Sequence, residues 1–384
     1  MGHAVVVGGG IGGLSAAVAL HRYGWRVTVL ERAPGFTAIG AGISLWPNAV
    51  RALETIGVGE RLAPLLSVQH GGGLRDRHGR RLTRWDVDAL TSRQGGPLTA
   101  VHRADLIETL RAALPGEWLR TGAEVTEVRP DGRVRIGDEE FQADLVVAAD
   151  GIRSRIRQAL WPDHPAPVYC GGTAIRGIAE MSEPIELSTT WHRGAEVGVI
   201  PLVDGRVYWW AGYVTEPGIR HADTKTYLTA RFGDWHAPIP ALIEATPPEA
   251  LLHHDVDYLA TPLPSYVRGR IAMLGDAAHA IPPFLGQGGC QAIEDAVVLA
   301  HSVSTKDTID DALREYDVQR RDRGRRVMLA TLRAGRTGML LRNPVATTIR
   351  AALLRVIPAS IAARANGAIT RWEPPRPPAQ PRTR

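Results

Sequence analysis

The sequence has little of what defines several special classes of protein. Its 384 residues include only 2 cysteines, too few for a disulfide framework and compatible with a reducing cytoplasm. The 41 glycines follow no repeat, which excludes collagen-like and solenoid architectures. The formal charge is only +5, which does not argue for a nucleic-acid partner. With 44% apolar residues, the chain suits a cytoplasmic protein of two subdomains.

Long apolar runs without charge are also missing. The N-terminal AVVVGGGIGGLSAAVAL lacks the basic leader of a secretion signal. The segment Val345–Ala363 carries Arg350 and Arg355, which would be costly in the middle of a bilayer. We therefore predict no membrane span. The tail from Trp372 is rich in proline and arginine, and we predict that it is disordered.

A dinucleotide-binding pattern is present at the N-terminus. An apolar strand at Ala4–Val7 precedes three glycines in the spacing GxGxxG, and a helical run and a second strand at Arg26–Leu30 follow. The glycines are Gly8, Gly10 and Gly13. They allow a tight turn and close approach of a pyrophosphate, while Glu31, about twenty residues further on, can accept hydrogen bonds from ribose hydroxyls. This pattern alone leaves open which dinucleotide is bound.

A second ligand-binding segment is Gly275–Ala296, GDAAHAIPPFLGQGGCQAIEDA. It follows an apolar strand and enters a helix at about Gly288, and the free N–H groups of such a helix start favour an anion. Glycines near this start let a flat ligand approach the main chain: Gly286, Gly288 and Gly289. Asp276 ends one apolar strand and Asp150 ends another. Because ligands bind at the carboxyl ends of strands in open sheets, these distant contacts favour FAD.

In these motifs the chain resembles the single-component FAD-dependent aromatic hydroxylases, the family of p-hydroxybenzoate, salicylate and urate hydroxylases. The motifs are GGGIGGLSAA with Glu31-Arg32, GAGISLWPNAVRAL at 40–53, VHRADL at 101–106, AADGIRSRIR at 148–157 and the segment from Gly275. The resemblance implies an α/β fold in which a Rossmann-like FAD-binding domain is interleaved with a mostly antiparallel β-sheet substrate domain. We expect 1–70, 97–170 and 265–371 to form the FAD-binding domain, 71–96 and 171–264 the substrate domain, and 372–384 a disordered tail.

The resemblance also implies which residues hold FAD. Gly12 and its neighbours would bind the pyrophosphate, Glu31 the adenosine ribose, and Asp276 the ribityl or pyrophosphate region. Asp150 belongs to a motif associated with both FAD and the transient nicotinamide donor. Gly289 and Cys290 would present backbone amides to the flavin pyrimidine edge, where relatives carry asparagine in place of the cysteine. The remaining implied FAD contacts are Arg32, Ser44, Arg103 and Val125.

Alternating strands predict the substrate domain. They are Gly171–Ala179, Glu186–Trp191, Glu196–Leu202 and Arg206–Thr215, with a further hairpin at Gly71–Trp85. Asp204-Gly205 is a strong hairpin turn signal. Tyr208 matches a tyrosine that the family places on a pocket strand, and alternation puts Trp210 on the same side. Simple packing is an equally good interpretation of these two rings.

Missing arginines indicate the kind of substrate. Where benzoate hydroxylases offer an arginine to the substrate carboxylate this chain has Ile200, and where urate hydroxylases offer one it has Glu196. We therefore predict a neutral or weakly polar aromatic or polycyclic substrate, with Arg176 as the remaining candidate cation. The predicted substrate contacts are Gly198, Ile200, Tyr208, Trp210 and Arg176. Pro283 and Tyr208 are the residues expected at the reacting atoms.

The resemblance implies a monooxygenase in which NADH or NADPH reduces FAD. The reduced flavin then reacts with O2, and a flavin C4a-hydroperoxide hydroxylates the aromatic ring. We expect no metal, and a monomer or homodimer. Other functions remain open: a flavin halogenase or geranylgeranyl-reductase-like enzyme shares the fold, although the halogenase signature GWxWxIP is absent, and a flavin-binding accessory protein would need no turnover. We interpret His279 as structural, and the basic run Arg320–Arg336 as the solvated face of a helix.

Overall fold

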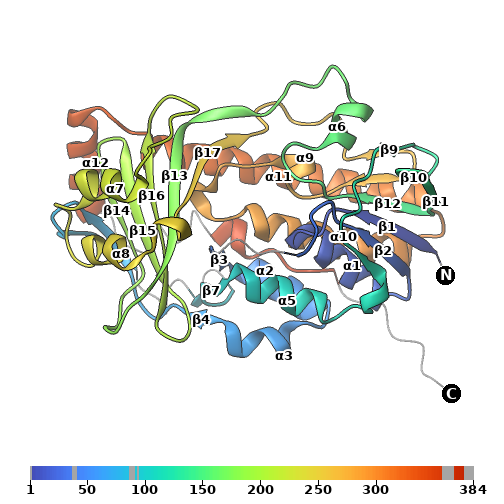
Figure 1. Cartoon of the computed structure of the whole chain (residues 1–384), viewed down its shortest axis with the longest axis horizontal. Helices are drawn as coiled ribbons and strands as arrows, with labels where there is room; N and C mark the ends of the chain where they lie inside the picture. Colours follow the sequence, from blue (N-terminus) through green and yellow to red (C-terminus); the bar gives the residue numbers. More distant parts are fainter. Residues whose placement is uncertain (1, 37–40, 86–90, 93–94, 357–366, 376–384) are drawn as a thin grey trace.

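The molecule is organised around two large sheets, one toward each end of its long axis (Figure 1). The computed structural model describes residues 2–36, 41–85, 91–92, 95–356 and 367–375. The α/β class and the mostly antiparallel second sheet agree with the prediction. None of the helices within the described residues combines the length and apolarity that crossing a membrane requires.

The first sheet has six strands and is parallel except at one edge. In spatial order they are β18 (Val267–Arg268), β19 (Ile271–Met273), β12 (Leu145–Ala148), β1 (His3–Val7), β2 (Arg26–Leu30) and β8 (Leu119–Arg120). Only β18 is antiparallel to its neighbour. Strand β12 is apolar throughout and buried, and β1 is apolar and buried from Ala4 onward, as expected for parallel strands that are covered by helices.

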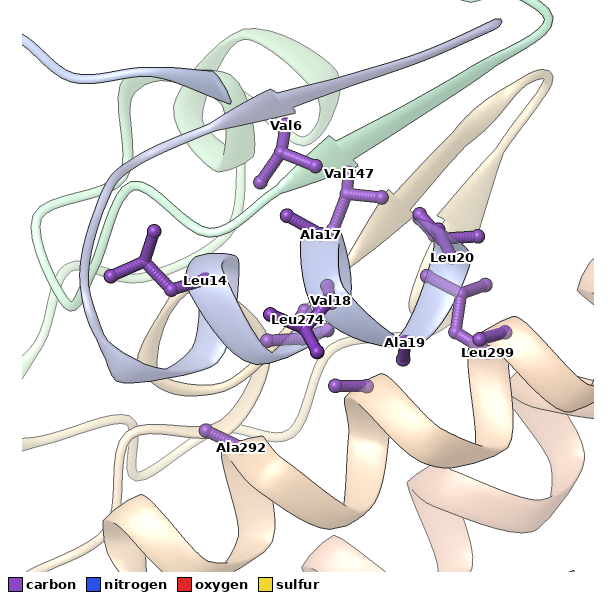
Figure 2. Close-up of a cluster of buried hydrophobic side chains, with 14 of the residues drawn as sticks. Val6, Leu14, Ala17, Val18, Ala19, Leu20, Val147, Leu274, Ala292 and Leu299 are labelled. Atoms are coloured by element: carbon purple, nitrogen blue, oxygen red, sulfur yellow. The ribbon is translucent and has the colours of Figure 1, made fainter. Parts of the chain in front are cut away.

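Two helices that are distant in sequence pack together beneath this sheet. Helix α1 (Ile11–Arg22) follows the glycine loop, and α10 (Gly288–Thr305) follows the segment that begins at Gly275. Figure 2 shows α1 between Val6 and Val147 of the sheet on one side and Ala292 and Leu299 of α10 on the other. The small side chain of Ala292 permits the two helices to approach closely. Their packing brings the two glycine-rich segments together.

The second sheet has seven strands and one parallel pair, β14 with β5. In spatial order they are β17 (Leu252–Tyr258), β13 (Val168–Glu180), β16 (Arg206–Val214), β15 (Ala195–Pro201), β14 (Ser188–His192), β5 (Gly73–Asp76) and β6 (Arg81–Arg84). The predicted hairpin at 71–85 is confirmed as β5 and β6. At the β15–β16 turn, Asp204 and Gly205 both have positive φ, +59° and +73°, as the turn signal predicts.

One face of the second sheet is covered and the other looks toward the first sheet. Helices α7 (Thr224–Phe232) and α8 (Ile239–Ala245) pack on the outer face around Trp209 (Figure 1). Between the large sheets lies a small one made of β3 (Gly42–Leu45), β7 (Thr99–His102) and β4 (Ser67–Val68). The inner face of the second sheet packs on it, because a Cβ at Gly42 would lie 2.5 Å from Tyr208.

The remaining elements surround these layers. A small sheet contains β9 (Glu127–Val128), β10 (Arg133–Ile136) and β11 (Glu139–Gln142). The other α-helices are α2 (Pro47–Thr55), α3 (Gly59–Leu62), α5 (Arg103–Arg111), α6 (Arg155–Leu160), α9 (Asp276–His279), α11 (Ile309–Thr337) and α12 (Pro344–Val356). Short 3-10 turns are η1 (Ala63–Leu65), η2 (Gly116–Trp118), η3 (Pro248–Ala250) and η4 (Pro283–Leu285).

The C-terminal region departs from two expectations. The run Arg320–Arg336 does lie on α11, but Arg320 and Arg323 are buried rather than solvated. Trp372 packs against the core, and its carbonyl oxygen accepts hydrogen bonds from the Arg51 guanidinium at 2.8 and 3.2 Å. The chain is therefore anchored at the point where we expected disorder to begin. Residues 376–384 of the predicted tail lie outside the described residues.

Candidate active site

The predicted cofactor residues gather at one edge of the parallel sheet. Strands β1, β2, β12 and β19 run parallel, so their carboxyl ends lie side by side. The residues that follow these ends are Gly8, Glu31, Asp150 and Asp276. Val125 comes shortly after β8, at the same edge, and packs partly against the core. This edge is where an open α/β sheet binds a ligand.

The glycine loop is shaped by contacts that only glycine permits. A Cβ at Gly13 would lie 1.9 Å from the carbonyl oxygen of Gly8, and Gly8 itself has φ +111°. At Gly12 a Cβ would lie 2.7 Å from Leu274, the residue before the second glycine-rich segment. Gly10, which caps α1 without any side-chain hydrogen bond, has nothing within 4 Å of a Cβ position. The loop is thus tight against the chain everywhere except at the open N-terminus of α1.

Two carboxylates flank this loop. Glu31 accepts hydrogen bonds from the backbone N–H of Gly9 at 2.7 Å and of Ala33 at 2.8 Å, so it fixes the loop while retaining acceptor capacity on both oxygens. Asp150 accepts from the Ile156 N–H at 3.3 Å through one oxygen, and its other oxygen is buried without a partner. Burial raises the pKa of Asp150, opposed by hydrogen bonds at the start of α6.

Asp276 lies at the centre of a charged group. Its side chain is accessible to solvent, yet protein surrounds it closely enough for burial to raise the pKa of the carboxyl, against the charges of His279 and Arg103. Burial, followed by the charge of Arg176, lowers the pKa of Arg103, whereas Asp276 and Tyr208 raise it. The charges of Asp276, Arg176 and Tyr208 therefore all act on Arg103, although these residues come from both halves of the molecule.

The start of α10 presents backbone donors to the same region. No side chain caps this helix, so its first N–H groups, including those of Gly289 and Cys290, have no intrahelical acceptor. Gly286 holds a left-handed conformation, φ +61°, and a Cβ there would lie 3.7 Å from the Cβ of Ser44. The helix dipole adds positive potential at this end. Uncapped N-termini of α1 and α10, with Asp150 and Asp276 beside them, fit a long cofactor that carries a pyrophosphate near its middle and a ring edge that becomes anionic at one end.

Cys290 is predicted to be inert. Its sulfur is buried, 3.7 Å from the carbonyl oxygen of Ser44 and 3.6 Å from that of Gly286, and burial raises the pKa of the thiol to about 12. Since only the thiolate reacts, native protein treated with iodoacetamide at pH 8 should leave Cys290 unmodified by mass spectrometry. After denaturation the same residue should react fully. Rapid labelling of Cys290 in the native protein would contradict this arrangement.

A buried ionic network behind α10 escaped sequence reasoning. The Arg320 guanidinium of α11 donates to Asp295 at 2.5 Å and to Glu294 at 2.6 Å. Arg323 donates to Glu294 at 2.6 Å, and Asn48 of α2 donates to the same carboxylate at 2.6 Å. The signal for this network in the sequence was the acidic pair Glu294 and Asp295 within an otherwise apolar helix. The network fixes α10 against its neighbours.

His279 belongs to this network, so its structural interpretation agrees with its contacts. Its Nε2 lies 2.6 Å from Asp295 Oδ2, and the same oxygen accepts the Gly275 N–H at 2.9 Å. Burial alone would lower the pKa of His279, but the charge of Asp295 and its hydrogen bond outweigh this effect, and the pKa is raised. His279 thus ties the loop that carries Asp276 to α10.

The predicted substrate residues share the inner face of the seven-stranded sheet. Gly198 pairs with Trp210 and Ile200 with Tyr208 across β15 and β16, and Arg176 of β13 pairs with Trp210 from the other side. The Tyr208 and Trp210 rings lie 5.7 Å apart between centroids. Burial raises the pKa of Tyr208, and the charge of Arg176 opposes the shift. Arg176 Nε is buried and has no hydrogen-bond partner among the residues that the structure describes.

Other predicted residues lie less centrally. Arg32 is exposed beyond β2, and no described contact joins it to the loop. Pro283 is exposed at the start of η4, three residues before Gly286, which adopts the αL conformation and leads toward α10. Their proposed roles therefore rest on the resemblance. Contacts that sequence reasoning missed include Gly42, against which Tyr208 packs.

Comparisons with known proteins point in one direction. A family profile described as "FAD binding domain" matches residues 2–331. Aurachin C monooxygenase/isomerase of Stigmatella aurantiaca is 39% identical over 361 residues, 92% of this chain and 94% of that protein. An FAD-dependent urate hydroxylase of Klebsiella pneumoniae is 34% identical over 344 residues, 85% of this chain and 88% of that one. The structure of Klebsiella pneumoniae HpxO complexed with FAD and uric acid superposes with TM-score 0.89 at 30% identity, covering 96% of each chain.

Proposed function

The chain belongs to the FAD binding domain family and is an FAD-dependent monooxygenase of the aromatic hydroxylase class, and we propose that its substrate is a neutral or weakly polar aromatic or polycyclic molecule. The family assignment confirms the resemblance, the fold class and the cofactor. Aromatic hydroxylases of this class use NADH or NADPH and O2 as co-substrates. The open question is which kind of ring this chain accepts.

The observation that carries the proposal is the inner face of the seven-stranded sheet. Ile200, Tyr208 and Trp210 on this face pack with Ile178 and Leu252 in one apolar cluster. Position 196 on the same face carries a carboxylate that accepts hydrogen bonds from two indoles. An anionic substrate there would meet an acid rather than an arginine, at a cost in free energy. Such a face favours a flat, uncharged ring.

Arg176 supplies the polar anchor that such a ring needs. Its buried, unpartnered Nε can donate to a hydroxyl or oxo oxygen of the substrate, and the Tyr208 hydroxyl lies beside it. A cation next to a ring hydroxyl stabilises its ionised form, which makes the ring richer in electrons at the carbon to be hydroxylated. We therefore propose Arg176 and Tyr208 as the pair that orients the ring.

The cofactor residues divide the remaining work. FAD, when bound, supplies the redox and oxygen-activating chemistry. We propose that the loop Gly8–Gly13 and Glu31 hold its adenosine end, that Asp150, Asp276 and Arg103 lie along its middle, and that the amides of Gly289 and Cys290 stabilise negative charge at its pyrimidine edge. Pro283 would help exclude water. We also propose that the chain divides into FAD-binding and substrate domains at the expected boundaries, which place β5 and β6 with the second sheet.

Spectral titration of the purified yellow protein tests the substrate class. 4(1H)-Quinolone, 1-naphthol and aurachin C should perturb the flavin absorbance saturably and accelerate NADPH oxidation with stoichiometric hydroxylated product. Urate and 4-hydroxybenzoate should do neither. Arg176→Gln should weaken the binding of the neutral ligand roughly tenfold, about the effect of losing a hydrogen bond from a charged donor. Tight binding of urate or 4-hydroxybenzoate, with no response to the neutral compounds, would refute the proposal.

A further inference from the structure

We propose that Glu196 is a positioning residue that holds the Trp210 ring flat over Gly198, so that the indole forms the floor on which the substrate ring lies. The inference rests on the proposed function, because the proposed aromatic substrate is the ligand that would lie on the Trp210 indole. It concerns a carboxylate that never touches the reacting atoms. Three observations carry it: where the indole lies, what holds its N–H, and what holds Glu196 in turn.

The indole of Trp210 covers the sheet where a side chain is missing. Trp210 and Gly198 are cross-strand partners on β16 and β15. A Cβ added to Gly198 would lie 1.9 Å from Cζ2 of the indole, so the six-membered ring rests directly on the glycine. This arrangement therefore requires glycine at position 198, because any side chain there would displace the indole ring from the sheet.

Glu196 fixes the rotation of this ring. It lies two residues before Gly198 on β15 and so points to the same face of the sheet. Its Oε1 accepts the Trp210 Nε1–H at 3.0 Å. An indole has a single N–H donor and no acceptor, so this bond selects one orientation of the ring plane. Without it, only packing would hold the ring.

The other carboxylate oxygen connects the floor to the C-terminal helices. Glu196 Oε2 accepts the Trp191 Nε1–H from β14 at 3.1 Å. The Arg350 guanidinium of α12 lies 4.8 Å from the centre of a Trp191 ring, and its Nη1 donates to the carbonyl oxygens of Thr337 at 2.8 Å and Gly338 at 2.9 Å. Glu196 thus has both oxygens engaged, one by Trp210 and one by Trp191, and Arg350 lies over the Trp191 ring.

Both partners of Glu196 are donors, which determines what can replace it. Burial raises the pKa of Glu196, while the two indole N–H groups and the charge of Arg350 oppose the shift. A leucine would fill much of the same space but offers no acceptor to either indole N–H. Glu196→Leu therefore removes both bonds, and Trp191→Phe shows separately what the second bond contributes.

The test combines a structural readout with ligand binding. Protein with 15N-labelled indoles, in the FAD-bound form, should show a shifted and slowly exchanging Trp210 N–H signal, assigned by its absence in Trp210→Phe. Glu196→Leu should retain FAD yet move that signal and speed its exchange. It should also weaken 4(1H)-quinolone binding tenfold or more and lower the yield of product per NADPH consumed. Trp210→Phe should lose as much, and the double variant no more than either single variant.

A control variant distinguishes failure of this inference from failure of the proposed function. Trp191→Phe removes the other N–H and leaves the floor bond, so it should bind the ligand within about threefold of the parent, consistent with the small cost of a peripheral contact. An equal loss in Trp191→Phe, additive losses in the double variant, or an unchanged Trp210 signal in Glu196→Leu would overturn the inference. If no neutral aromatic perturbs the parent flavin, the substrate proposal fails. The indole signal then decides the positioning role alone.

Discussion

Gly10→Ala is expected to fold as the parent chain does and to lose FAD. Among the described residues, nothing lies within 4 Å of a Cβ at this position, and the backbone is extended, with φ −76° and ψ −178°. The new methyl group therefore meets none of the residues that the structure describes. It would instead occupy the space at the open N-terminus of α1 where we place the pyrophosphate, and overlap of this kind costs about 3 kcal/mol, or roughly a hundredfold in affinity.

Two other glycines provide the comparison for this prediction. Gly13→Ala places its Cβ 1.9 Å from the Gly8 carbonyl oxygen, so it should lower both the unfolding temperature and FAD content. Gly116→Ala, where nothing lies within 4 Å, should preserve both. The ratio of flavin absorbance to protein absorbance measures the FAD content, and thermal unfolding of the apoprotein measures the unfolding temperature. If Gly10→Ala purifies with the same FAD content as the parent protein, the proposal that this loop binds the pyrophosphate is wrong.

Arg320→Met should lower the free energy of unfolding by about 3–5 kcal/mol, the usual cost of removing one partner from a buried charge cluster. Arg320 is 1% exposed, and its guanidinium is the partner of both Glu294 and Asp295. Methionine fills much of the space but leaves the two carboxylates with fewer donors. Arg323 and His279 still contact them, which sets the lower end of the range.

Urea unfolding of the FAD-loaded protein measures this loss. Arg325→Met, an exposed arginine on the same helix, is the matched control and should change stability by less than about 0.5 kcal/mol. A second variant, Glu294→Gln with Arg320→Met, should recover part of the loss because it removes one of the uncompensated charges. Equal stability of Arg320→Met and Arg325→Met would show that the network does not hold α10.

The gathering of the proposed cofactor residues at one edge of the parallel sheet could be predicted because each of the signals involved is local. The strand before Gly8, the strand before Glu31 and the strand before Asp276 are short apolar runs that end in a residue of unusual type, and parallel strands align such ends without further information. What sequence spacing could not show is how the loop is closed. Glu31 accepts the Gly9 N–H, a bond between two strand ends that depends on how the sheet is twisted.

Local sequence signals could not predict the buried charges or the contacts between neighbouring strands. Arg320 was interpreted as solvated because helical spacing considers one helix at a time, whereas its partners lie on α10. Glu196 was identified only as the place where an arginine is missing. Its role depends on strand register, which brings Trp210 opposite Gly198 and Trp191 opposite Glu196. Strand β17, with its polar run of two histidines and two aspartates, also lacked a recognisable pattern.

A crystal structure of the protein grown with FAD and 4(1H)-quinolone would test the central claim most directly. We predict pyrophosphate density at the N-terminus of α1 near Gly10, the isoalloxazine ring at the N-terminus of α10, and the quinolone between that ring and the Trp210 indole. FAD density at any other surface, or a quinolone bound away from the inner face of the seven-stranded sheet, would contradict it.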